Sequence, residues 1–400
     1  MTMANRREFV ALAGATILSG CASSLANGTS EEDGGTANLN GGLQGPWPTY
    51  GQDFRNTRHR DHQLSFADDA AGQKVGPAPD DSKVPPIIGP DARYGTVGGD
   101  SWNVVSYEFD GTRRWTNESI AAYSPPTLYG RTLFISREPE TAALDAETGD
   151  VYWRQDSGTS SHDTSPLVAD GTVFFHESSL VALNAETGNV EWRSEELPAL
   201  GQGTAIDDQR VYVTVGDNGD GGLAAFDRAT GETAWSATEV GEIYYPPVVG
   251  DGAVFVLDTE SRLHRLTVAD GTVEWTTAFD STNQRPGLAL AEDTLFVTEG
   301  SVAVHAVNAT DGTTLWTDDR GLSGPPLVCG ETVYVYEDAA ESANATISAL
   351  AAGTGEQVAR YRSPGDPVSP LVAADDCIYY VGEPQEGTYH ARAVFAVGQP

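Results

Sequence analysis

A glycine turn followed four residues later by tryptophan recurs along this sequence. Between residues 110 and 360 the pattern occurs seven times, and the following position is tryptophan in six of them. The step between copies is about 40 residues, which is typical of an architecture in which each copy forms one supersecondary unit. We therefore expect one unit copied many times. The glycines are Gly111, Gly149, Gly188, Gly231, Gly271, Gly312 and Gly355, and the following residues are Trp115, Trp153, Trp192, Trp235, Trp275, Trp316 and Ala359.

Each copy has the pattern of four short strands. In residues 166–192, apolar and β-branched runs alternate with tight turns, for example at Asp170-Gly171 and from Asn184 to Gly188. A single sheet of this size cannot bury its faces, but copies packed radially can, so we predict an all-β propeller. A proline opens the first strand in seven copies, and Thr204 stands at the equivalent place in one more copy. The sequence therefore predicts eight blades. These prolines are Pro86, Pro126, Pro166, Pro247, Pro286, Pro326 and Pro370.

The last blade lacks a fourth strand, because the chain ends soon after its third. We expect residues 46–84 to form an N-terminal closing segment, with the missing strand lying between Trp47 and about Phe66, and residues 85–400 to form the propeller. Closing the ring in this way would hide both sheet edges. The tryptophans are expected to fill the wedges between neighbouring blades. Ala359 breaks that pattern, and Tyr361 on the same strand face is expected to fill part of the gap.

The N-terminal residues have the character of an export signal. Arg6 and Arg7 precede a short apolar run that ends at Cys21, and this run is too short to span a bilayer. Residues 1–21 resemble a twin-arginine signal joined to a lipobox, which implies export of a folded protein, lipid attachment to Cys21 and a place on the outer face of the cytoplasmic membrane. The alternative is an N-terminal core helix. Residues 22–45 are predicted to be a flexible tether.

Charge restricts the possible partners. The chain has 58 acidic and 23 basic residues, a formal net charge of −35, which would repel nucleic acid phosphates. Self-repulsion of such a surface is largely screened in molar salt, so we expect a halophilic, haloarchaeal protein at the cell surface. After Cys21, the remaining cysteines are Cys329 and Cys377, and their spacing leaves both free thiols and a disulfide open.

The repeat contains an Ala-x-Asp-x-x-Thr-Gly-x-x-x-Trp box, with close copies at residues 143–153, 182–192 and 225–235. This box resembles the pyrroloquinoline-quinone (PQQ) type of propeller repeat over roughly residues 85–397. The resemblance implies one of two functions: a dehydrogenase that holds the quinone and calcium, or a scaffold like BamB, the lipoprotein that helps to assemble outer-membrane barrels. The dehydrogenases are similar to one another in having adjacent cysteines over the quinone. This chain has no such pair, so we expect no quinone.

The loops between the second and third strands, and between blades, vary in length and composition. Variable loops on a rigid scaffold commonly carry binding sites, so this end of the ring is predicted to be the ligand face. An acidic residue recurs just beyond the second strand, and these carboxylates could ring the channel mouth and bind calcium or a basic protein segment; Asp217 and Asp220 are the candidate metal ligands. The alternative is ordinary halophilic surface charge. The candidate residues are Glu138, Glu177, Asp217, Asp258, Glu299, Glu337, Glu383, His162, Tyr245 and Arg285.

Three functions are therefore compatible with the sequence. The first, which we favour, is a non-catalytic cell-surface propeller that binds a protein or peptide and touches the membrane only through its lipid. The second is a dehydrogenase dependent on PQQ and calcium. The third is a structural surface protein without a specific ligand.

Overall fold

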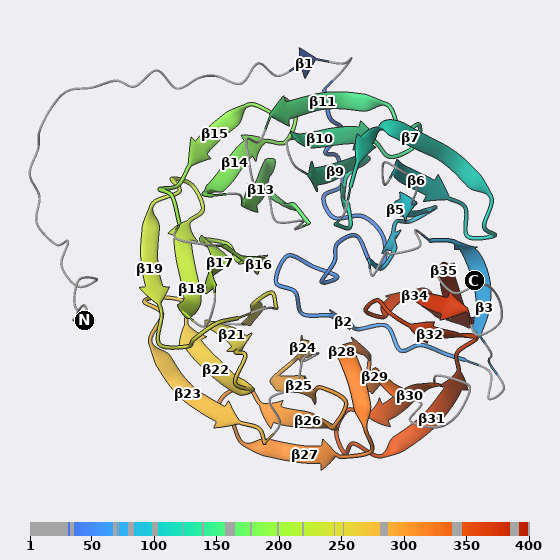
Figure 1. Ribbon diagram of the computed structural model, residues 1–400, viewed down its shortest axis with the longest axis vertical. Coiled ribbons are helices and arrows are strands. Elements are labelled where there is room, and N and C mark those ends of the chain that lie inside the picture. Colours follow the sequence, from blue (N-terminus) through green and yellow to red (C-terminus); the bar gives the residue numbers. More distant parts are fainter. Residues whose placement is uncertain are drawn as a thin grey trace, which may run out of the picture.

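Eight four-stranded antiparallel sheets stand around a central axis in the computed structural model (Figure 1). The structure describes residues 31–32, 36–66, 70, 72–78, 84–97, 103–122, 124–137, 140–156, 165–176, 178–197, 200–217, 220–243, 245–250, 252–280, 287–337, 346–384 and 392–398. The prediction of an eight-bladed β-propeller closed by an N-terminal strand is confirmed. No described residue lies in a helix long and apolar enough to cross a bilayer.

Blades one to four follow one another around the ring, each built from consecutive strands that run outward from the axis. Blade one contains β4 (Ile87–Ile88), β5 (Arg93–Val97), β6 (Asn103–Tyr107) and β7 (Arg113–Ala121). Blade two contains β8 (Thr127–Tyr129), β9 (Thr132–Arg137), β10 (Glu140–Asp145) and β11 (Val151–Asp156), with β1 (Glu31–Glu32) on its outer edge. Blade three contains β12 (Leu167–Ala169), β13 (Thr172–His176), β14 (Leu180–Asn184) and β15 (Val190–Arg193). Blade four contains β16 (Leu200–Ile206), β17 (Arg210–Asp217), β18 (Asp220–Asp227) and β19 (Thr233–Ala237).

Blades five to eight complete the circle. Blade five contains β20 (Val248–Gly250), β21 (Ala253–Leu257), β22 (Arg262–Thr267) and β23 (Val273–Ala278). Blade six contains β24 (Gly287–Ala291), β25 (Thr294–Glu299), β26 (Ala303–Asn308) and β27 (Thr314–Asp318). Blade seven contains β28 (Leu322–Cys329), β29 (Thr332–Glu337), β30 (Thr346–Ala351) and β31 (Gln357–Arg362), and β2 (His59–Arg60) pairs in parallel with β28. Blade eight contains β32 (Gly365–Pro367), β33 (Val372–Ala374), β34 (Cys377–Pro384), β35 (Ala393–Gly398) and β3 (Gly72–Pro77).

The strand that closes the ring is β3, which pairs antiparallel with β35. It belongs to the predicted closing segment, residues 46–84, but it lies after the stretch from Trp47 to Phe66 that we expected to supply it. That earlier stretch has a different place, because its backbone hydrogen-bonds to the innermost strands of the blades. Blade eight is thus built from both ends of the described chain, as Figure 1 shows at β3 and β35.

The tryptophans lie between blades, each against the turn glycine of the next blade. Gly149 has a φ of +79°, and a Cβ atom there would stand 2.6 Å from Cε3 of Trp115. Glycine is therefore needed both for the backbone conformation and for the close approach of the ring. The same arrangement joins Trp153 to Gly188 and Trp192 to Gly231. It continues at Trp235 with Gly271, Trp275 with Gly312 and Trp316 with Gly355.

Each of these rings also packs on an aromatic residue of its own blade. Phe134 and Trp153, for example, have ring centroids 6.0 Å apart, and the indole N–H of Trp153 donates to the Ala185 carbonyl oxygen of the next blade at 3.0 Å. The Trp153 ring is therefore buried while its one polar atom, the indole nitrogen, keeps a hydrogen bond. The other intrablade pairs are Tyr94 with Trp115, Phe174 with Trp192, Tyr212 with Trp235, Phe255 with Trp275 and Phe296 with Trp316.

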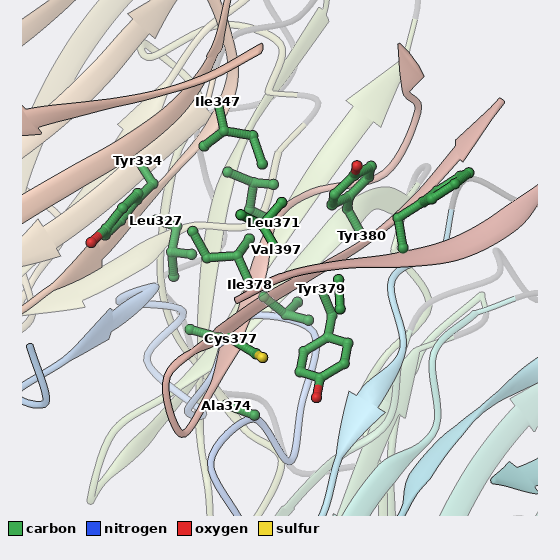
Figure 2. Close-up of a cluster of buried hydrophobic side chains, with 14 of the residues drawn as sticks. Leu327, Tyr334, Ile347, Leu371, Ala374, Cys377, Ile378, Tyr379, Tyr380 and Val397 are labelled. Atoms are coloured by element: carbon green, nitrogen blue, oxygen red, sulfur yellow. The ribbon is translucent and has the colours of Figure 1, made fainter. Parts of the chain in front are cut away.

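Between blades seven and eight, where Ala359 replaces tryptophan, Phe66 of the N-terminal segment enters the seam. Its ring lies edge-on to Tyr361, with centroids 4.9 Å apart, and also contacts Tyr334. Tyr361 therefore fills part of the gap, as expected, and Phe66 fills more of it. Figure 2 shows the buried cluster at this seam, where Leu327 and Tyr334 of blade seven face Ile378 of blade eight.

The two remaining cysteines belong to this same buried cluster and are free thiols. Burial raises the pKa of Cys329 to about 12 and that of Cys377 to about 11. Both sulfurs are therefore protonated at neutral pH and act as small apolar groups in the core.

Replacing Trp153 by alanine should lower the free energy of unfolding by about 3–5 kcal/mol, because a fully buried ring and its hydrogen bond are lost. Leu315→Ala is the control: this side chain lies on an outer strand and is 53% exposed, so its loss should change stability by less than about 0.5 kcal/mol. Denaturant unfolding measures both values. Equal effects of the two substitutions would contradict the wedge role of the tryptophan.

Candidate functional site

The central channel is occupied by the chain itself. Residues 37–60, which we call the plug, run around the inside of the ring, as the blue segment of Figure 1 shows. Plug carbonyl oxygens accept hydrogen bonds from innermost-strand N–H groups of six blades. The donors and acceptors are Ile88 to Trp47, Leu128 to Pro48, Ile206 to Phe54, Val249 to Arg55, Leu290 to Thr57 and Val328 to Arg58.

Two buried polar side chains fix the plug in place. Asn56 is 6% exposed and donates from Nδ2 to the carbonyl oxygens of Thr204 and Pro247, at 2.8 and 3.0 Å, which ties blade four to blade five. Arg58 is 4% exposed and donates to the carbonyl oxygens of Pro326 and Leu371, at 2.9 and 2.5 Å, which ties blade seven to blade eight. The plug therefore bridges neighbouring blades from inside the ring.

Arg58 sits at the centre of the ring as a cation surrounded by carbonyl oxygens. Its guanidinium carbon lies 5.5 Å from the centroid of the Trp47 ring, a cation–π geometry. Burial lowers the pKa of Arg58, since the charged form has lost its hydration. The carbonyl dipoles and the indole face replace that hydration and hold the Arg58 guanidinium in the channel.

Beside the plug, the described residues leave a cavity of about 30 Å³, lined by residues that include Tyr50, Asn56, Arg58, Tyr245 and Pro325. This volume suits about one water molecule, whereas pockets for small organic ligands have about 300–1,000 Å³. No carboxylate lines it, although a calcium ion takes several oxygen ligands. The described residues that line this cavity therefore do not fit a quinone with calcium. Tyr245, a predicted ligand-face residue, does border this cavity.

Four of the acidic residues beyond the second strands have described side chains, and all four are engaged within their own blades. In blade five, Asp258 is 2% exposed and accepts from Nε of Arg262 at 2.6 Å and from Nε2 of His264 at 3.1 Å. The other ring nitrogen of His264 then accepts from the Thr276 hydroxyl at 2.9 Å. Burial raises the pKa of Asp258, but the hydrogen bonds from His264 and Arg262 outweigh burial, so this pKa lies below its ordinary value.

Blades six to eight repeat this arrangement with different partners. Glu299 lies 2.9 Å from Nε2 of His305, whose other nitrogen is 3.0 Å from the Thr317 hydroxyl. The remaining pairs are Glu337 with Arg360 and Glu383 with Arg392. These four carboxylates thus contact the third and fourth strands, away from the axis, instead of forming a set of free charges at the channel mouth. Their predicted role in ligand binding stays a prediction.

The other predicted site residues lie outside the described part of the chain or lack described side chains. Glu138, Glu177, His162 and Arg285 fall outside the described residues, as do Arg6, Arg7 and Cys21. Asp217 and Asp220 face each other in register across β17 and β18, which brings the two candidate metal ligands to one hairpin end. The described residues contain no group of three or more histidine, cysteine, aspartate or glutamate side chains placed to hold a metal ion.

Two hollows lie at the opposite end of the ring, between the first-to-second and third-to-fourth strand turns of blades two to four. Their volumes are about 430 and 440 Å³, and we call them the turn-face hollows. They occur where the plug departs from its regular path, since its described residues make no backbone hydrogen bond to β12 of blade three. Tyr129, Phe54, Asp170 and Asp208 border the first hollow, and Trp192, Glu191, Asp170 and Asp208 border the second.

Aromatic walls and a carboxylate rim characterise the turn-face hollows. Phe54 and Tyr129 are half-buried and stacked at 6.2 Å in the first hollow, and half-buried Trp192 borders the second. An ion pair between Asp170 and Arg228 separates the two. Carboxylates outnumber arginines in both linings, where Arg228 borders each hollow and Arg55 the first. Aromatic faces next to such an excess of carboxylates attract cations, so the hollows suit lysine or arginine side chains.

Sequence reasoning missed these hollows because the turns at this end are short and uniform. Plug residues Leu43, Asp53, Phe54 and Arg55 line the first hollow, and the path of the plug through the channel leaves no periodic signal in the sequence. A run of aromatic and charged residues at Asp53-Phe54-Arg55, within the predicted closing segment, was the one available sign. Burial raises the pKa of Asp53, although Thr57 and Arg55 donate hydrogen bonds to it.

Asp258→Asn should destabilise the fold by about 1.5–3 kcal/mol at pH 7, because charge-assisted hydrogen bonds are lost. The pKa of Asp258 is depressed in the folded state, so its contribution is present above the unfolded value of about 3.9 and is lost as pH falls through the folded value. The difference between wild type and variant should therefore shrink below about pH 4. Unfolding curves across pH measure it.

The control for this experiment is Glu260→Gln, which removes a neighbouring acid with a 68% exposed side chain that also pairs with Arg262. Its effect should stay within about 0.5 kcal/mol at every pH. A difference between wild type and Asp258→Asn that does not depend on pH would show that the charge of Asp258 contributes nothing.

Comparisons with known proteins agree with the geometry. A family model described as "Outer membrane protein assembly factor BamB" matches residues 102–198, 176–285 and 279–386. Outer membrane protein assembly factor BamB of Yersinia pestis is 26% identical over 193 residues, 46% of this chain and 40% of that protein. The chain thus spans less than half the length of this curated relative.

Solved structures share the fold at low identity. Quinohemoprotein alcohol dehydrogenase from Comamonas testosteroni superposes with a TM-score of 0.67 and 14% identity, covering 88% of this chain and 81% of that chain. BamB from Moraxella catarrhalis gives a TM-score of 0.61 and 19% identity, covering 84% and 98%. Enzymes and an assembly factor therefore share this architecture, and fold alone does not choose between them. Because the family model covers more than half of the sequence, the chain belongs to the BamB family of propellers with PQQ-like repeats.

Proposed function

We propose that this chain is a non-catalytic, exported propeller scaffold that binds an extended segment of another protein at the cell surface. The observation that carries the proposal is the plug: the innermost strands of six blades already hydrogen-bond an extended stretch of polypeptide. The plug occupies those strand edges, but its bonds show how this ring holds extended polypeptide: backbone hydrogen bonds supply affinity without demanding a particular sequence. The anchor in this proposal is a lipid on Cys21.

Quinone-dependent dehydrogenation is the competing function, because dehydrogenases are among the structures with this fold. Three features of the site argue against it. The plug fills the channel, the cavity beside it has about 30 Å³, and the described carboxylates beyond the second strands are paired within their blades. A catalytic base needs an unengaged carboxylate close to the substrate, and these groups do not supply one.

The turn-face hollows supply the place for the partner. Their volumes accommodate side chains, and their half-buried aromatic rings resemble the anchors on which binding energy concentrates in protein interfaces. Carboxylates at the rim favour a basic segment, and the net charge of −35 would speed its approach. The partner class in our proposal is therefore an extended protein segment with lysine or arginine side chains.

Adding PQQ and calcium to the protein from residue 22 onward, in molar salt, should leave the melting temperature unchanged, and so should calcium alone. A ligand at 100 times its dissociation constant would add about 2.7 kcal/mol of stability, which thermal unfolding detects readily. A shift that needs the quinone would overturn the scaffold proposal. A shift with calcium alone would instead support a cation site at the loop face, where Asp217 and Asp220 lie.

Site-specific photo-crosslinking in native membranes tests the partner and its place. A photoreactive amino acid in place of Asp208, at the turn-face hollows, should give an adduct whose crosslinked peptide is basic. Glu292 provides the matched control, because it is an exposed acid at the corresponding turn of blade six, away from the hollows. Replacement of Tyr245 probes the central cavity near the loop face.

The outcomes separate the remaining functions. An adduct at position 208 and none at 292 supports the proposal. An adduct at 245 alone would keep a binding scaffold but move its site to the loop face. Adducts at none of the three positions would contradict partner binding and favour the purely structural surface protein.

A further inference from the structure

The turn between the third and fourth strands of blade six contains an Asn-x-Thr triplet, formed by Asn308, Ala309 and Thr310. A triplet of this kind accepts N-linked sugar in exported proteins when it lies on the surface. The chain has four Asn-x-Ser/Thr triplets, which begin at Asn27, Asn117, Asn308 and Asn344. The first and the last of these asparagines lie outside the described residues, so the structure describes two acceptor side chains.

In the blade-six turn, the side chain of Asn308 caps the turn through its oxygen and leaves its nitrogen free. Oδ1 accepts from the backbone N–H groups of Thr310 and Asp311, at 2.8 and 3.2 Å, which is the pattern of an Asx turn. Nδ2 makes no hydrogen bond to the rest of the described chain, and it is open to solvent. Thr310 is exposed. The two side chains that define the triplet can therefore be reached from outside.

The same turn in blade three shows why this nitrogen is free in blade six. The equivalent Asn184 also accepts hydrogen bonds in an Asx turn, but its Nδ2 donates to Oε1 of Glu191 on the next strand, at 3.2 Å. In blade six the residue that corresponds to Glu191 is Leu315, which cannot accept a hydrogen bond and is 53% exposed. Blade six thus lacks the acceptor for the asparagine nitrogen and leaves an apolar side chain uncovered.

The triplet of blade one is engaged in the fold instead. Nδ2 of Asn117 donates to the Gly149 carbonyl oxygen at 2.8 Å, across the seam to blade two. Its Oδ1 accepts from the Ser119 hydroxyl at 2.8 Å, and that hydroxyl accepts in turn from Nη2 of Arg154 at 2.7 Å. The amide and the hydroxyl of this triplet therefore hold two blades together, and a sugar on Nδ2 would have to compete with that packing.

We propose that Asn308 carries an N-linked oligosaccharide and that Asn117 does not. This inference rests on the export that the proposed function includes, because the modification belongs to exported proteins. The donor class is an oligosaccharide joined through its anomeric carbon to the phosphate of a lipid carrier. The bond between the anomeric carbon and the phosphate oxygen breaks, and the lipid phosphate leaves with the electron pair. Nδ2 of Asn308 forms the new bond to the anomeric carbon and loses its proton to a base of the transferase.

A sugar at this position is compatible with the turn and with the proposed partner site. The modified side chain keeps Oδ1 as an acceptor, so the hydrogen bonds from Thr310 and Asp311 remain. The first sugar would cover part of Leu315 and so remove apolar surface from water. Blade six stands across the ring from blade two in Figure 1, so the sugar would be attached away from the turn-face hollows.

Mass spectrometry of peptides from the protein purified from native membranes tests the proposal. The peptide that contains Asn308 should be heavier by the mass of one or more sugars, and the peptide that contains Asn117 should have its unmodified mass. Asn308→Asp keeps the turn acceptor, as Asp145 and Asp227 show in other blades, and should lose the added mass. Thr310→Ala should also lose it with the asparagine intact, whereas Thr310→Ser should retain it.

Export is measured separately, so that the two proposals can fail independently. A membrane-impermeant amine reagent applied to intact cells should label the exposed Lys74 of an exported chain. A labelled chain without sugar at Asn308 would overturn this inference and leave the proposed function in place. Sugar at Asn117 alone, or sugar at Asn308 that persists in Thr310→Ala, would also overturn it. A chain that is neither labelled nor modified would contradict both proposals.

Discussion

The contact between a tryptophan ring and the turn glycine of the next blade is the interaction on which this propeller depends. It demands a residue without Cβ in a left-handed conformation, a flat ring large enough to fill the wedge, and a carbonyl oxygen within reach of the indole N–H. Six of the eight seams have the contact between tryptophan and glycine, and in five of them the indole N–H also donates to a carbonyl oxygen of the next blade. The remaining two seams lie on either side of blade eight, where the two ends of the chain meet.

Because blade eight combines strands from both ends, its seams need fillers from outside the repeat. Phe66 arrives from the segment that leads to β3, and Arg93 arrives from blade one. The plug adds a second level of closure, since Asn56 and Arg58 bridge blades from inside the ring. The ring is therefore closed three times, by a strand, by seam fillers and by a central segment.

The periodic part of this architecture could be predicted from the sequence, and the aperiodic part could not. The positions of Trp153 and Gly188 have equivalents at a fixed step along the sequence. This repeat predicted the number of blades, the order of their strands and the tryptophan that fills each wedge. The paths of the plug and of β3 depend on contacts between residues hundreds of positions apart, which leave no periodic trace, and the closing strand was placed too early. The predicted carboxylate ring failed to anticipate His264 and Arg360, because pairing across strands is invisible until register is known.

The plug also has a kinetic meaning. Its side-chain bonds join Asn56 to residues 148 and 191 positions away, and Arg58 to residues 268 and 313 positions away. Contacts of such sequence separation form late and slowly, because the intervening chain must first be ordered. The plug leaves the ribosome before every blade, yet it can complete its bonds only after the last one. Completion of these bonds therefore requires that blades four, five, seven and eight have all been made and folded.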